Sequence, residues 1–182
     1  LTKHLSLDSR IAYTLQQQQS PSVGTDGGGL VYQVYRLRTR YPIFTPEGRL
    51  NGGAGSSANN TYALLREGGY NNIDRNFFDG VFTFTAANFV KGLKLKAVLG
   101  QQYRFGAREL FSRTVELWGR FTPIFYLNNP NSFSRTNELT KNTNLQYLAD
   151  YDLALGKNKF HILAGYQWED NRFEGVTTSS NS

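Results

Sequence analysis

A two-residue repeat in hydrophobicity constrains this chain more than any other feature of its sequence. In five segments most apolar side chains take one parity and polar side chains dominate the other. Around Leu95, for example, Leu93 and Leu99 share a parity, while Lys94 and Lys96 take the other. Successive side chains of a strand point to opposite faces, so each segment predicts a β-strand with one apolar and one polar face. The five segments are residues 5–16, 78–86, 93–105, 144–155 and 160–169.

Two kinds of fold place such strands side by side. Strands that cross a bilayer need roughly 9 to 11 alternating residues and carry aromatic side chains near their ends. These segments have comparable lengths, with Tyr13, Tyr103, Phe105, Tyr166 and Trp168 near their ends. A soluble antiparallel sandwich or barrel shows the same alternation with its apolar faces turned inward. Alternation alone does not decide whether the apolar face contacts lipid or packs into the core of a soluble protein.

The connections between the segments favour the membrane. Residues 89–93 and 155–159 are short and contain glycine, as tight hairpins require. Residues 1–5 look like the end of a third such turn, whereas the loops at about 17–72 and about 115–142 are long. Short turns at one end and long loops at the other are typical of bacterial outer-membrane barrels. We therefore predict an all-β fold: an antiparallel up-and-down meander of about five long strands, forming a section of a transmembrane β-barrel wall.

The first long loop contains two helical patterns. Residues 30–38 carry an apolar stripe, and residues 62–70 form one or two turns that glycine stops. We expect short helical turns in the extracellular loops.

Composition removes several other classes of protein. No apolar run reaches the roughly 18 residues of a membrane-spanning helix, and the absence of cysteine excludes disulfides and thiolate metal sites. The net charge of +6 is spread along the chain and selects no partner. The chain has no methionine and opens within a turn-like stretch, so we expect an internal piece of a longer protein.

Five runs of sequence, in this order and approximate spacing, resemble TonB-dependent transporters of the SusC/RagA type. The runs are YPIFTPEG (41–48), ALLREGGYNN (63–72), FDG (78–80), KGLKL (91–95) and FSRTV (111–115). The resemblance extends from residue 1 to about 175.

The resemblance implies a stretch in the first part of a large barrel, after the plug domain. It implies import of oligosaccharides or peptides across a bacterial outer membrane, driven by a TonB complex, with a SusD-like surface lipoprotein as lid. The plug and the TonB-interacting box do not occur in this stretch, so we expect it not to transport by itself. The alternative is a soluble β-rich module that binds carbohydrate or nucleic acid.

Six residues are the candidates for contact with a glycan or peptide substrate. Three lie in the first long loop and three on polar strand faces expected to point inward. They are Arg36, Arg38, Tyr41, Gln102, Arg104 and Glu169. Aromatic rings stack on sugars, and guanidinium groups pair with acidic groups.

We expect no catalytic, metal or cofactor site, and hence no enzyme. His4 and His161 are the only histidines, and they fall on the first and fifth strands of the meander. Asp150 and Asp152 share a face, as general acid/base pairs do, but no nucleophile or third acid accompanies them in the pattern. We interpret all four as solvated polar side chains.

Nucleic acid is not an expected partner. A platform for single strands needs stacking rings and cations on one face. Parity places Lys94 and Lys96 on the face opposite Tyr103 and Phe105.

Overall fold

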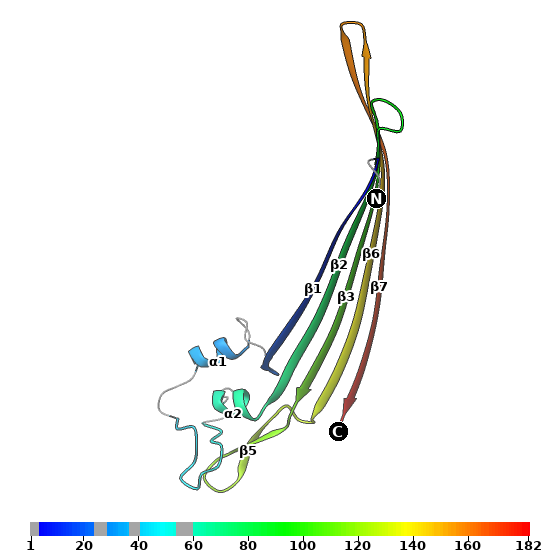
Figure 1. Ribbon diagram of the computed structural model, residues 1–182. Coiled ribbons are helices and arrows are strands. Elements are labelled where there is room, and N and C mark those ends of the chain that lie inside the picture. The colour runs from blue at the N-terminus through cyan, green and yellow to red at the C-terminus, as the bar shows by residue number, and fades with distance from the viewer. Residues whose placement is uncertain (1–3, 24–28, 37–40, 54–59) are drawn as a thin grey trace. The chain divides into compact units, whose positions relative to one another are not determined.

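The main element of the structure is one antiparallel sheet of five strands. The computed structural model describes residues 4–23, 29–36, 41–53 and 60–182. The order of strands in the sheet is β1-β2-β3-β6-β7 (Figure 1). Their bounds are β1 Leu5–Pro21, β2 Gly69–Ala87, β3 Leu93–Ser112, β6 Ser132–Leu155 and β7 Asn158–Asn181. Each strand lies beside the previous one of the five, which confirms the predicted all-β meander.

A second, two-stranded sheet lies between β3 and β6 in the sequence. It pairs β4 (Val115–Trp118) with β5 (Pro123–Leu127) in antiparallel register. None of the helices in the described residues is long and apolar enough to cross a membrane.

The strands of the main sheet are longer than the alternating segments that predicted them, with lengths from 17 to 24 residues. Polar side chains pair across the added lengths. Gln17 Nε2 donates to Asp74 Oδ1 at 3.2 Å, and the hydroxyls of Thr136 and Thr177 lie 3.0 Å apart. Strands are held together by backbone hydrogen bonds, so pairing continues where hydrophobic alternation stops.

Both long connections are shorter than predicted for the same reason. The first spans 22–68, where the sequence predicted about 17–72, and contains α1 (Leu30–Arg36) and α2 (Thr61–Arg66). The second spans 113–131, where the sequence predicted about 115–142, because β6 begins at Ser132. The two short helices expected in the first connection are confirmed.

Two tight turns join neighbouring strands, at 88–92 and 156–157. Gly92 has φ 83° and Gly156 has φ 62°, in the left-handed region that glycine enters without steric cost. A Cβ at Gly92 would also collide with the carbonyl oxygen of Asp152. The third expected turn, at 1–5, lies largely outside the described residues.

The chain divides into two compact units, which are described separately. The first unit comprises residues 1–16, 75–105 and 138–175, and the second comprises 17–74, 106–137 and 176–182. All five alternating segments fall in the first unit.

The first unit is a single layer of sheet with two chemically different faces. A shallow hollow on one face is lined mainly by side chains of the predicted apolar parity, from β2, β3, β6 and β7. They are Phe84, Ala86, Leu95, Ala97, Tyr147, Ala149, Ala164 and Tyr166. Tyr147 is 50% exposed and Tyr166 62% exposed. No large apolar side chain described in this unit is buried.

The second unit has a hydrophobic core. Its buried apolar side chains are Ala63 and Leu64 of α2, Val115 and Leu117 of β4, and Leu127 of β5. Leu117 is 1% exposed.

Asn60 joins α2 to the preceding loop. Its side chain accepts a hydrogen bond from Ala63 N as the helix N-cap and donates to the carbonyl oxygens of Ile43 and Asn51 at 2.7 and 3.1 Å. A side chain that caps a helix and satisfies loop carbonyls fixes both segments in one arrangement.

Candidate functional site

The polar face of the first unit contains a hollow of about 310 Å³ near the middle of β3. Gly100 has no side chain and leaves space between the neighbouring strands. The polar groups around it come from four adjacent strands. They are Asp79, Gln101, Gln102, Asn142, Asn144, Gln146 and Glu169, and the apolar side chains Val81 and Val98 also line the hollow. Parity had placed Asp79, Gln102, Asn144, Gln146 and Glu169 on polar faces, and the sheet brings these faces together.

Amides and carboxylates give this hollow both donors and acceptors. Asn142 Nδ2 donates to Glu169 Oε1 at 3.3 Å, which links β6 to β7. Carboxylate oxygens only accept, whereas amides donate and accept, so the set is suited to a ligand rich in hydroxyl or amide groups. A second, smaller hollow of about 60 Å³ adjoins it and includes Gln102 and Arg104.

The structure brings together three of the six predicted contact residues. Gln102 lines both hollows, Glu169 lines the larger, and Arg104 lines the smaller. Arg36 ends α1 and Tyr41 is half-buried at the start of the following loop, both in the second unit. Arg38 lies outside the described residues.

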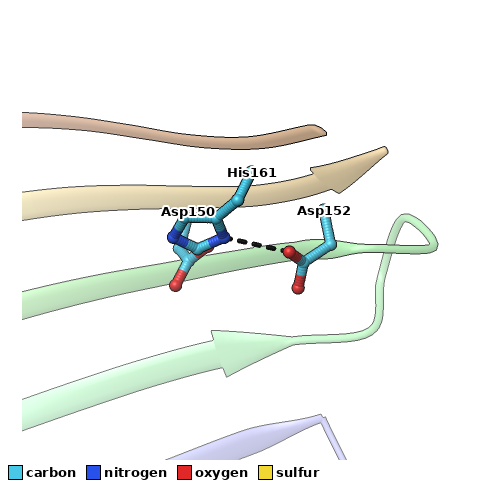
Figure 2. A group of neighbouring side chains, drawn as sticks. All are labelled: Asp150, Asp152 and His161. Atoms are coloured by element: carbon cyan, nitrogen blue, oxygen red, sulfur yellow. Dashed lines mark hydrogen bonds and ion pairs between the residues drawn. The ribbon is translucent and has the colours of Figure 1, made fainter. Parts of the chain in front are cut away.

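A separate cluster forms beside the β6–β7 turn, where His161 of β7 meets two carboxylates of β6 (Figure 2). His161 Nδ1 lies 2.9 Å from Asp152 Oδ1, with which it shares a hydrogen bond, and 3.3 Å from Asp150 Oδ1. The side chain of Asp150 is 37% exposed, that of His161 59% and that of Asp152 75%. Water can therefore reach the cluster.

Sequence reasoning missed this cluster, although a register argument would have found it. A turn of only Gly156 and Lys157 places Leu155 opposite Asn158. Three residues further from the turn on each strand, Asp152 then faces His161. Asp150 shares a face with Asp152 because it is two positions away. The interpretation of Asp150, Asp152 and His161 as solvated side chains agrees with their exposure, but it treated each strand alone and did not pair His161 with the two carboxylates.

His4 has different surroundings. Its Nδ1 lies 3.2 Å from the carbonyl oxygen of Ala87, and its ring centroid lies 5.3 Å from that of Phe89. Among the described residues, only Asp150, Asp152 and His161 form a group of three that could hold a metal ion.

Searches of the sequence against models of protein families and against curated proteins found no match.

Proposed function

We propose that this chain forms part of the wall and outer loops of an outer-membrane β-barrel, within a TonB-dependent transporter of the SusC/RagA type. The observation that carries the proposal is the uncovered apolar face of the first unit. The transporter imports oligosaccharides or peptides, and the chain itself has no catalytic role.

The uncovered face argues for an apolar phase outside the protein. Exposed apolar surface costs about 25 cal/mol per Å² in water, and contiguous apolar patches beyond a few hundred Å² are rare on soluble monomers. Here side chains such as Phe84, Tyr147 and Tyr166 stay exposed across neighbouring strands. Lipid acyl chains would cover this face without a second protein layer.

The chemistry changes toward the long-loop end of the same face. Gln101 and Thr143 exchange hydrogen bonds at 3.1 and 3.2 Å. Two residues further from the turns, the ring centroids of Phe78 and Tyr103 lie 6.4 Å apart, and Lys141 Nζ lies 5.5 Å from the Tyr103 ring centroid. Aromatic rings with a nearby lysine are typical of the membrane–water interface. We place the outer boundary of the hydrocarbon region at this row.

The connections support the same orientation. Residues 88–92 and 156–157 make short turns, while residues 22–68 and 113–131 make long connections that contain helices and the β4–β5 sheet. In outer-membrane barrels the short turns are periplasmic and the long loops extracellular. The long connections would then face substrate and a SusD-like lipoprotein, with the TonB complex acting on the whole transporter from the periplasm.

The polar hollow supports a role in substrate passage. In a barrel the face opposite lipid lines the interior, which would place Gln102, Arg104 and Glu169 along the path of a glycan or peptide. Amide, guanidinium and carboxylate groups bind hydroxyls and peptide groups by hydrogen bonds. These three residues are our candidates for substrate contact on the wall.

A soluble β-rich binding module is the second candidate. It would need a layer packed on the apolar face to form a core. Across the described part of the chain, the buried apolar side chains all belong to the second unit. The membrane proposal therefore fits the first unit better.

Site-specific fluorescence tests the proposal with matched neighbours. The sequence contains no cysteine, so Tyr147→Cys, Gln146→Cys, Tyr166→Cys and Gln167→Cys each add one thiol for an environment-sensitive dye. After reconstitution into vesicles, we expect blue-shifted emission, quenched by spin-labelled lipid, at positions 147 and 166. At 146 and 167 we expect quenching by aqueous iodide. The same environment at all four positions, or a detergent-free monomer with a cooperative melt, would overturn the proposal.

A further inference from the structure

We propose that Asp150, Asp152 and His161 form a binding site for a divalent transition metal of the zinc class at the β6–β7 hairpin. The inference does not depend on the proposed function, because all three ligands lie in one hairpin of the first unit.

The donor set selects the class of metal. Imidazole nitrogen with carboxylate oxygens is a common ligand set for Zn²⁺, whereas Ca²⁺ and Mg²⁺ prefer oxygen ligands alone. The only other histidine, His4, is engaged elsewhere, and the chain has no cysteine to compete for the metal.

The distances suit a single ion. Zinc–nitrogen and zinc–oxygen bonds of roughly 2.0–2.2 Å in a tetrahedron separate neighbouring ligand atoms by about 3.3–3.6 Å. His161 Nδ1 lies 3.3 Å from Asp150 Oδ1 and 2.9 Å from Asp152 Oδ1, and all three ligand atoms lie within 4.8 Å of one another. Small side-chain rotations would open the triangle enough for a metal to replace the proton on Nδ1, which would pass to solvent.

Asp150 supplies an independent observation. Its Oδ1 atom is buried and accepts no hydrogen bond, although His161 Nδ1 lies 3.3 Å away. A buried carboxylate oxygen without a hydrogen bond is costly and rare. Coordination would satisfy this oxygen, while the exposed side of the cluster leaves room for water as a fourth ligand.

The site has a structural consequence. Ligands from β6 and β7 would be joined through one ion only a few residues from the turn. We expect bound metal to slow the opening of this hairpin end, as a cross-link between adjacent strands does.

Calorimetric titration with ZnCl₂ tests the site in the full-length protein in detergent. We expect the wild-type chain to contribute one saturable site. His161→Gln, Asp152→Asn and Asp150→Asn should each weaken zinc binding by more than about tenfold, the loss that follows removal of even an outer-shell partner. His4→Gln and Asp79→Asn are the matched controls, a histidine and a polar-face acid outside the cluster, and should bind as the wild type does.

A second readout needs no variant. Co²⁺ added to the wild-type protein should give the visible absorption bands of a four-coordinate site, and Zn²⁺ should abolish them. Far-UV circular dichroism identifies any variant that has lost its strands. The proposal is overturned if the wild type shows no saturable zinc binding, if His161→Gln binds zinc as tightly as wild type, or if His4→Gln alone removes binding.

Discussion

The two units of this chain differ in how far they bury their apolar side chains. The second unit packs Leu64, Leu117 and Leu127 into a core between α2 and the β4–β5 sheet. The first unit arranges most of its apolar residues on one face of a single sheet and leaves them exposed or half-buried. The second unit therefore derives stability from its own packing, whereas the described residues of the first unit bury no large apolar side chain. This difference in burial is the observation on which our membrane-wall proposal for the first unit rests.

The largest loss of stability among our predictions is expected for a substitution at Leu117, in the core of the second unit. Leu117→Ala should destabilise the second unit by about 3–5 kcal/mol, because a fully buried leucine leaves a cavity. Hydrogen exchange of the β4 and β5 amides measures the loss. Leu95→Ala is the control on the exposed face of the first unit, and its cost should stay below about 1 kcal/mol in detergent. Equal losses of stability at the two positions would contradict the difference in burial between the units.

The next largest loss of stability is expected when a charge is introduced on the apolar face of the first unit, compared with the same charge on its polar face. Tyr147→Arg places a charge on the apolar face and should cost about 2–4 kcal/mol of folding free energy in a bilayer. Gln146→Arg, on the neighbouring polar face, should cost much less. Denaturant titration of the protein folded into vesicles measures both. A larger cost at position 146 than at 147 would reverse the assignment of faces.

The third prediction tests whether Asn60 both caps α2 and fixes residues 43–52 through its hydrogen bonds to Ile43 and Asn51. Asn60→Ala should cost about 2 kcal/mol, since it removes the helix cap. Asn60→Asp keeps the acceptor for Ala63 N but removes the donors to Ile43 and Asn51. Hydrogen exchange should then show loss of protection in residues 43–52 with less change in α2. If Asn60→Asp loosens α2 as much as Asn60→Ala does, the link to the loop is not a separate role.

The smallest effect concerns an exposed ion pair. Arg113 Nη1 lies 3.1 Å from Glu67 Oε2, and both side chains are substantially exposed. Arg113→Gln should change the stability of the second unit by at most about 1 kcal/mol, with the difference vanishing at high salt. Thermal melts at two salt concentrations measure it. A large, salt-independent loss would mean that Arg113 acts through packing.

Part of the fold could be predicted because strand geometry is local. The pleat alternates side chains with period two, so parity alone placed Phe84 and Tyr147 on one face and Gln102 and Glu169 on the other. Hairpin glycines were recognised for the same reason, since Gly92 and Gly156 supply positive φ. Strand ends were not recognised, because pairing of polar stretches leaves no hydrophobic signal.

One of the two candidate sites could be predicted in part from the sequence, and the other was missed. Gln102, Arg104 and Glu169 shared a face by parity, and the sheet brought them near one another. The cluster of Asp150, Asp152 and His161 depends on the register between two strands, which a strand-by-strand analysis does not use.

The sequence by itself determined that this chain forms a two-faced meander, because period-two hydrophobicity acts within each strand. Tertiary structure alone decided two things: how far the polar strands extend, and which buried residues form the core of the second unit. Both depend on contacts between segments distant in sequence. Such contacts are fixed by packing and backbone pairing, and the local pattern of residues does not encode them.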